Sequence, residues 1–539
     1  MAAGPRHRAK RRKATARRCG LAAAAVGIGV GLGAVGGQSV AWADTGHPDT
    51  SASSASSASA SSHSPASGPR KSDGGHNARR AASATATSRD KSPAAGLATS
   101  RRSTAHVNSP ATQLNPSHTP GTTAPAESTD AVASTARTTP AIVPLAAVTT
   151  SLPTASTPQP PGPLSPIAQL IALPGHIVNT VLQALDMTAA ASGPQSPLNF
   201  APIDELIFTV FRRIEHAAGL DATPTAQPVP PALIYTGPTT GLTPTVAQFL
   251  NAAAAEYVLG GVPGGLQQFT VNGVPMTSTN VFSGESAQVW VTPQSQIIIA
   301  YQGTTGGTNL LFNPLIAISQ IVTDLQIIFT GTTPRAFTDA LAFEQRVQDA
   351  AALQGYSTSD IFVTGHSLGG WEAEYVAQQT GLGGIGFESP GINTIVAGNG
   401  ANSGFVNIET YGDPAAYFST DLPGLQPFMP RYVPGGGSKP HYGPIVMIGD
   451  PNAVAPLFNS SALWGYGPIG DVIFMMDTLG NFFEHHLPAM QAYNLDVNPD
   501  PTVVPWLGLP MGPVETGYGT LTISQLLQAA SLAGTLITP

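Results

Sequence analysis

The middle of the chain alternates short apolar runs with stretches of helical composition. Apolar runs of strand length recur at five places: 287–291, 296–301, 361–364, 383–387 and 405–411. The first two flank a Thr-Pro-Gln-Ser turn, a pattern typical of a β-hairpin. Helical stretches lie at 243–257, 337–353 and 371–378, and Pro244 is expected at the first helical position of the earliest one. Strands alternating with helices predict an α/β domain over residues 233–497, with a mostly parallel sheet flanked by helices.

Helical spacing of apolar residues also appears outside this domain. Residues 162–221 contain two such stretches, which predict a short helical pair. Three roles stay open for the pair: packing on the domain, a small docking module, or contact with a membrane, for which its polar face is thin. The Pro-rich stretch 222–232 separates it from the domain. Beyond the domain, residues 498–539 are expected to form a C-terminal extension with one helix, at 520–537.

The first 161 residues have a different composition. A basic cluster, a small-residue apolar run and Ala41-Trp42-Ala43 predict a secretory signal peptide at residues 1–43. The alternative is an uncleaved membrane anchor, although the apolar run is short for a span. Residues 44–161 are mostly Ser, Thr, Ala and Pro, and such a segment buries too little apolar surface to fold. We therefore expect a secreted or cell-envelope-associated protein with a disordered tether, which is a candidate for envelope association.

Charge narrows the range of partners. Residues 1–43 hold eight Lys and Arg and no Asp or Glu, so the remainder has 15 basic against 31 acidic residues, a formal net charge of −16. Nucleic acid is therefore not expected as a partner. A calcium loop is suggested by the spacing of Asp496, Asn498 and Asp500, but Pro501 and Leu507 stand where such a loop needs glycine and glutamate. No metal and no cofactor are predicted.

The segment 361–378 carries the clearest chemical signal. Gly365-His366-Ser367-Leu368-Gly369 has the form G-x-S-x-G between a predicted strand and a predicted helix. In that context the motif is a nucleophile elbow, a sharp turn that exposes the serine hydroxyl above the sheet. Ser367 is therefore the candidate nucleophile. The backbone N–H of Leu368, next to it, is one expected donor of an oxyanion hole.

A second oxyanion donor is expected where the strand 296–301 runs into Gln302-Gly303-Thr304. We predict the backbone N–H of Thr304, with its hydroxyl as a further candidate. The following run, 309–329, is too apolar for an exposed loop. It is either a buried helix or a flap that covers the site and opens towards lipid; its position favours the flap.

Acid and base candidates follow the elbow in the order Ser…Asp…His. Asp413 ends the strand 405–411, and functional side chains gather at the carboxyl ends of parallel strands. It is preferred as triad acid over three competing aspartates: Asp360, Asp421 and Asp450. His486 precedes a predicted late helix and is the preferred base, with His485 close behind and His441 as the outside alternative. His366 is adjacent to the nucleophile and is expected to pack beside the elbow.

Several motifs together resemble the fungal-type (class 3) lipase family. They are Val363–Gly370 at the elbow, Ala300–Thr304 at the oxyanion loop, Thr323–Leu325, Gly386–Pro390, Gly412–Pro414 and Pro440–Gly443. The resemblance covers about half of the chain and implies an α/β-hydrolase fold with lipase or esterase activity; it also implies a structural role for His441. Gln302 stands where that family usually has arginine, and Trp371-Glu372 where it prefers small residues. His486 is also farther from Tyr493 than the family's spacing.

These features together predict a serine esterase or lipase that acts on lipid or other acyl esters. A lipid–water interface is one candidate place for this reaction. Ser367 would form an acyl-enzyme, His486 would transfer the proton and Asp413 would orient the histidine. One alternative is an envelope acyltransferase with the same triad. Another is a non-catalytic surface or adhesion protein on a hydrolase scaffold, because a fold does not imply activity.

Overall fold

The computed structural model describes residues 158, 162–184, 201–224, 230–304, 314–330, 332–425, 439–497 and 512–539. The signal peptide predicted at 1–43 and the tether predicted at 44–161 lie outside the described residues, except for Pro158. The first part of the run 309–329 is also outside them. Within the described residues, no helix combines the length and the apolar character that crossing a bilayer requires.

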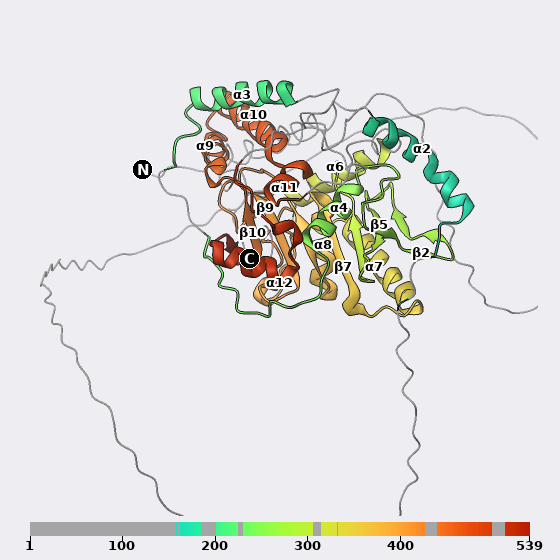
Figure 1. Cartoon of the computed structure of the whole chain (residues 1–539). Helices are drawn as coiled ribbons and strands as arrows, with labels where there is room; N and C mark the ends of the chain where they lie inside the picture. The colour runs from blue at the N-terminus through green and yellow to red at the C-terminus, as the bar shows by residue number, and fades with distance from the viewer. Residues whose placement is uncertain are drawn as a thin grey trace, which may run out of the picture. The chain divides into compact units, whose positions relative to one another are not determined.

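A mixed sheet of nine strands occupies the centre of the fold (Figure 1). Its strand order is β1-β5-β6-β7-β8-β9-β10-β11, with β4 paired to β5. The strands are β1 (Gln267–Gln268), β4 (Thr277–Thr279), β5 (Ser286–Val291), β6 (Ile297–Tyr301), β7 (Ile361–His366), β8 (Gly383–Phe387), β9 (Phe405–Thr410), β10 (Ile445–Ile448) and β11 (Leu536–Ile537). Strands β6 to β10 are parallel, and β5 and β6 form the expected antiparallel hairpin. The prediction of a mostly parallel α/β sheet is confirmed. A two-stranded ladder, β2 (Thr270–Val271) with β3 (Val274–Pro275), lies beside it.

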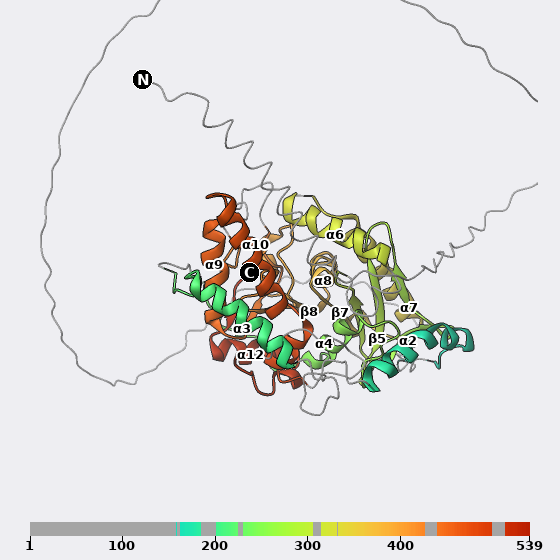
Figure 2. The ribbon, with the colours of Figure 1, turned by 90° about the horizontal axis from the view of Figure 1, so that it is seen from above.

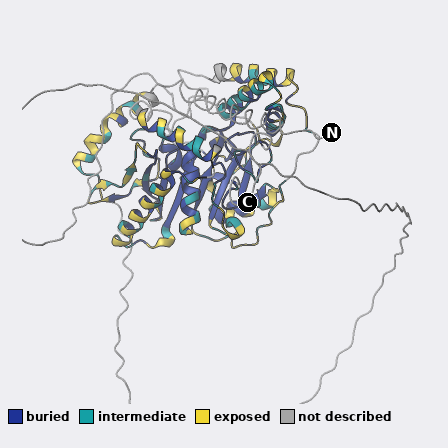
Figure 3. Cartoon of the chain, turned by 180° about the vertical axis from the view of Figure 1, so that it is seen from behind, coloured by how far each residue is buried: buried dark blue, intermediate teal, exposed yellow. Residues whose placement is uncertain are grey.

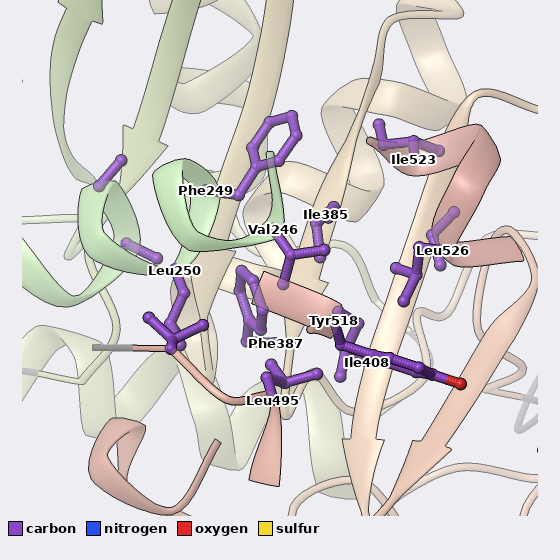
Figure 4. Close-up of a cluster of buried hydrophobic side chains, with 14 of the residues drawn as sticks. Val246, Phe249, Leu250, Ile385, Phe387, Ile408, Leu495, Tyr518, Ile523 and Leu526 are labelled. Carbon is purple, nitrogen blue, oxygen red and sulfur yellow. The ribbon is translucent and has the colours of Figure 1, made fainter. Parts of the chain in front are cut away.

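Helices cover both faces of this sheet. They are α4 (Val246–Ala255), α6 (Pro314–Phe329), α7 (Arg335–Leu353), α8 (Leu368–Thr380), α9 (Val454–Leu463), α10 (Pro468–His485), α11 (Pro488–Asn494) and α12 (Ile523–Ala533). Alternate residues of β6 divide between two cores, because successive side chains of a strand point to opposite faces. Ile298 joins the core beneath α4 and α12, which Figure 4 shows, and Ile299 joins the core beneath α7 and α8. Figure 3 shows the buried strands inside the partly exposed helices.

Two predicted helix boundaries are wrong, and each has a local cause. Helix α4 begins at Val246 and Pro244 precedes it, because Thr245 caps the helix. The backbone N–H of Gln248 donates to the Thr245 hydroxyl and the Thr245 N–H donates to the Gln248 side chain, which completes a capping box. The C-terminal helix α12 does not reach residue 537. It ends before Gly534, whose φ of 76° provides a left-handed cap.

The chain after this cap becomes part of the sheet. Strand β11 pairs antiparallel with β10, with Val446 opposite Leu536. Leu526 and Leu536 are buried in the core beneath α4. Residues 523–537 thus share the sheet and the core of the domain, although the sequence pattern set them apart as an extension.

The two helices that precede the domain pack on it at separate places (Figure 2). Helix α2 (Pro166–Ala184) approaches the chain after α4 so closely that a Cβ at Gly175 would lie 2.4 Å from the Leu259 carbonyl oxygen. Helix α3 (Ala201–Ala217) lies against α10, where Arg212 Nε is 3.4 Å from Glu484 Oε1. Each of the two helices therefore contacts residues of the domain.

Candidate active site

Ser367 occupies a sharp turn between β7 and α8. Its φ of 59° and ψ of −125° are unusual for a residue with a side chain. Its N–H donates to the Phe387 carbonyl on β8 (2.9 Å), and its own carbonyl accepts the first bond of α8 from Trp371 (3.1 Å). Ser367 is half-buried while all its immediate neighbours from 361 to 370 are buried. The strand–turn–helix context that the elbow motif requires is therefore present.

The two flanking glycines allow this turn because backbones meet there. A Cβ at Gly365 would lie 2.1 Å from the Gly369 carbonyl oxygen, and a Cβ at Gly369 would lie 2.1 Å from the Tyr301 carbonyl oxygen. Both contacts are with backbone atoms, which no side-chain rotation can relieve. The motif thus brings the start of α8 directly against the ends of β6 and β7.

Asp413 and His486, 73 residues apart in the chain, are hydrogen-bonded to each other. The separation of His486 Nδ1 from Asp413 Oδ2 is 2.8 Å, and both side chains are buried. Asp413 follows β9 after Gly412, whose φ is 88°, and its Oδ1 accepts the Ala415 N–H at 3.0 Å. Because a carboxylate accepts here, His486 carries its proton on Nδ1, which leaves Nε2 as the basic nitrogen.

Burial sets the charge of this pair. Removal from water raises the pKa of Asp413, while hydrogen bonds from Glu388 and the backbone oppose the shift. Burial lowers the pKa of His486 to about 4. The imidazole is therefore neutral near pH 7, as a general base must be.

His366 links the elbow to the segment that carries His486. Its Nε2–H donates to the His486 carbonyl at 2.7 Å, and its Nδ1 accepts the Tyr257 hydroxyl at 2.8 Å. The ring centroids of His366 and His486 are 4.7 Å apart, and the Phe482 ring stacks on the His486 imidazole with a centroid distance of 4.2 Å. With both nitrogens engaged and its pKa lowered by burial, His366 is not a base. It packs beside the elbow and places His486 next to the strand end that carries Ser367.

Thr304 follows β6, and its hydroxyl donates to Asp324 Oδ2 of α6 at 2.7 Å. A hydroxyl has a single hydrogen, so this side chain cannot donate to an oxyanion at the same time. The suggestion that the hydroxyl assists is therefore disfavoured. The backbone N–H groups of Thr304 and of Leu368, the first residue of α8, stay the predicted oxyanion donors.

The competing histidines have other surroundings. His441 is buried, with Nδ1 2.9 Å from Asp421 Oδ1 and Nε2 2.8 Å from the Ser389 carbonyl oxygen. It ties the loop after β8 to the chain before β10, a structural role. His485 lies against Gly412, where an added Cβ would be 3.0 Å from its ring. Burial lowers its pKa to about 4.

The competing aspartates also have local partners. Asp421 pairs with His441, as stated above. Asp450 accepts the Asn452 N–H at 2.9 Å and caps a short 3-10 helix. Asp360 accepts the Ser357 N–H at 3.1 Å, before β7 begins. Of these four aspartates, Asp413 is the one that is hydrogen-bonded to His486.

Sequence reasoning missed two residues at the site. Tyr257 was expected only as a helix end, yet its hydroxyl bonds His366. Glu388 appears in the sequence analysis only within the motif Gly386–Pro390, yet it is buried and its carboxyl group accepts hydrogen bonds from the N–H and the hydroxyl of Thr410. A buried position directly after a strand, occupied by a carboxyl group, is the signal that could have singled out Glu388.

Two residues that differ from the motifs of the class 3 lipases, Gln302 and Trp371, donate hydrogen bonds to backbone carbonyls. The Gln302 side-chain amide donates to the Glu256 carbonyl at 2.9 Å. Trp371 donates its indole N–H to the Gly391 carbonyl at 3.0 Å. Both residues are buried, so they form part of the core around the elbow.

No family model and no curated protein matches the sequence. Among solved structures, the chain is similar to the extracellular lipase LipA from Serratia marcescens, with 21% identity and a TM-score of 0.22 over 28% of each chain. It is also similar to the Rhizomucor miehei lipase propeptide complex, with 15% identity and a TM-score of 0.27, over 43% of this chain and 86% of that chain. The match thus spans little more than a quarter of the Serratia lipase. At these TM-scores the similarities indicate no function, so any proposed function depends on the geometry of the site.

Proposed function

We propose that this chain is a serine hydrolase of the α/β-hydrolase type that cleaves carboxylic esters. Ser367 attacks the acyl carbonyl, His486 takes the hydroxyl proton on Nε2 and returns it to the leaving group, and Asp413 holds the imidazole through Nδ1–H. The backbone N–H groups of Leu368 and Thr304 stabilise the oxyanion.

One observation carries this proposal. The 2.8 Å bond between Asp413 and His486 joins segments that are far apart in the chain, at the strand ends where the elbow lies. The backbone of Ser367 adds support, because a purely structural turn would not require a strained serine. The φ of 59° at Ser367 is such a strain, and strained residues concentrate at functional sites.

The proposed substrate class is a lipid ester. Helix α6 is bonded through Asp324 to Thr304, and it exposes Leu315, Ile318 and Val322 by 56%, 61% and 58%. Their spacing places them on one helical face, and the opposite face is buried through Ile316 and Ile327. An apolar surface of this kind next to the site suits acyl chains and supports the flap account of the run 309–329.

The test is the hydrolysis of p-nitrophenyl esters over a range of acyl lengths. Ser367→Ala should lower turnover by about 10⁵–10⁶-fold, and Asp413→Asn by about 10⁴-fold, because the histidine would lose its correct tautomer. The matched control Ser359→Ala, at an exposed position, should leave the rate unchanged. Equal rates in wild type and Ser367→Ala would refute the proposal.

The same assay with an added alcohol addresses acyl transfer. Hydrolysis should give the free acid as the main product, whereas a predominant new ester of the alcohol would assign the chain to acyltransferases. No turnover by a folded wild type on any acyl length would favour a non-catalytic scaffold. Export and envelope association stay predictions, which fractionation of the producing cells would test.

A further inference from the structure

Tyr257 lies just beyond helix α4 and contacts two segments of the candidate site. Its hydroxyl oxygen is 2.8 Å from His366 Nδ1, beside the elbow. The same oxygen lies against the loop after β6, because a Cβ at Gly303 would collide with it and would lie 2.5 Å from the His366 carbonyl oxygen. Glycine at position 303 therefore permits the phenol to enter between the elbow and the loop that carries Thr304.

A second contact holds the same loop to the end of α4. The Gln302 side-chain amide donates to the Glu256 carbonyl at 2.9 Å, and Gln302 is buried. Adjacent residues at the end of α4 thus contact adjacent residues of the loop, because Tyr257 meets Gly303. The end of α4 and this loop are thereby fixed to each other, which restricts where the Tyr257 hydroxyl can lie.

The partner of His366 Nε2 determines where the imidazole carries its proton. This nitrogen is 2.7 Å from the His486 carbonyl oxygen, which can only accept, so Nε2 carries a hydrogen. Burial lowers the pKa of this imidazole, which is therefore neutral and has Nδ1 as an acceptor. The Tyr257 hydroxyl then donates to Nδ1. Burial raises the pKa of this phenol, so the hydroxyl keeps its proton.

His486 is held at its backbone and at its ring by different partners. His366 donates to its carbonyl, and Asp413 accepts its Nδ1–H at 2.8 Å. The Phe482 ring stacks on its imidazole. The other tautomer of His366 would place a lone pair opposite the His486 carbonyl oxygen, and the two would repel each other. The base would then move relative to Ser367, the next residue after His366 in the chain.

We infer that Tyr257 and His366 are positioning residues: the Tyr257 hydroxyl fixes the Nε2–H tautomer of His366, and this N–H holds the backbone of the base His486 beside the nucleophile. The inference rests on the proposed triad and adds no step to the reaction. In this role neither side chain contacts the acyl group, so the loss of either should lower kcat with little change in KM. An imidazole without a donor at Nδ1 divides between two tautomers, and only one of them bonds the His486 carbonyl.

Two changes remove one contact each. Tyr257→Phe removes the donor to Nδ1 and keeps the ring, and it should lower kcat by about 3–10-fold, the loss of one hydrogen bond. His366→Leu leaves the buried His486 carbonyl without its nearest partner, and it should lower kcat by about 10–100-fold. The matched control Tyr466→Phe, at a residue that is 88% exposed, should leave kcat unchanged. Wild-type kcat in Tyr257→Phe and His366→Leu would overturn the inference.

A third variant separates the tautomer from simple packing. His366→Gln places a side-chain amide near the position of Nε2, and an amide N–H donates without a tautomer to fix. It should retain most of kcat, and Tyr257→Phe should cause no further loss in this background. A packing role for Tyr257 predicts the same loss in both backgrounds, which would overturn the inference. Because Tyr257→Phe and His366→Gln change the shape little, this comparison holds even if His366→Leu does not fold.

Nitrogen NMR of the histidine rings keeps this inference separate from the proposed hydrolase function. In Ser367→Ala with isotope-labelled histidine, the signals that are absent from Ser367→Ala/His366→Gln belong to His366. They should show a protonated Nε2 and an unprotonated Nδ1, and Tyr257→Phe should add the other tautomer. A protonated Nδ1 beside an intact Tyr257, or a spectrum that Tyr257→Phe leaves unchanged, would overturn the inference. If the wild type hydrolyses no ester but the expected pattern is found, the function proposal fails and the tautomer assignment stands.

Discussion

Replacing Ser367 by glycine should make the protein more stable than replacing it by alanine. Both variants lack the hydroxyl, so they differ only in the Cβ atom. With φ at 59° and ψ at −125°, a residue that has a Cβ is strained at this position, and glycine is not. The comparison therefore isolates the backbone strain of the elbow from the chemistry of the serine.

The expected magnitude follows from two opposing effects. A sparsely populated conformation of this kind costs about 1–3 kcal/mol. Glycine loses more conformational freedom on folding than alanine, at a cost of about 0.5–1 kcal/mol. The free energy of unfolding of Ser367→Gly should thus exceed that of Ser367→Ala by up to about 2.5 kcal/mol.

Urea unfolding, followed by circular dichroism, measures this difference. The control is the same pair of changes at Ser359, an exposed residue in a 3-10 helix. There glycine should be less stable than alanine by about 0.5–1 kcal/mol. If glycine were also the less stable variant at position 367, the elbow would not be strained and the reasoning would be refuted.

Two further predictions concern the surroundings of the elbow. Gly369→Ala should lower the free energy of unfolding by about 1–3 kcal/mol in urea titrations, because its Cβ meets the Tyr301 backbone. The control is Gly162→Ala, where the nearest atom to an added Cβ is 4.0 Å away, and equal losses would contradict the argument. Burial raises the pKa of Asp324 to about 7. Since the unfolded chain ionises first, stability should fall from about pH 4 to 7 by at most about 1.4 kcal/mol per unit, and Asp324→Asn should lose this component. Unchanged pH dependence would show that Asp324 titrates normally.

Local patterns predicted much of the fold. The hairpin of β5 and β6, the strand β7 and the turn at Ser367 are found where the sequence places them. Each is signalled by residue types within one short stretch of the chain. The predicted start of α4 at Pro244 is wrong because Thr245, one residue later, caps the helix.

Other parts could not be predicted from neighbouring residues. Whether α2 and α3 pack on the domain depends on partners such as Leu259 and Glu484, which lie far along the chain. The pairing of β11 with β10 likewise requires a strand that the two-residue segment 536–537 hardly signals.

The sequence by itself predicted the strained position of Ser367, because the glycines on both sides of it permit the sharp turn by which a strand runs directly into a helix. Only the tertiary structure decided that His486 meets Asp413, that His441 meets Asp421, and that Glu388 meets Thr410. Several histidines and carboxyl groups have similar local sequences. Which of them meet, and which keep a proton, depends on burial and on contacts across the sheet, and these exist only once the chain has folded.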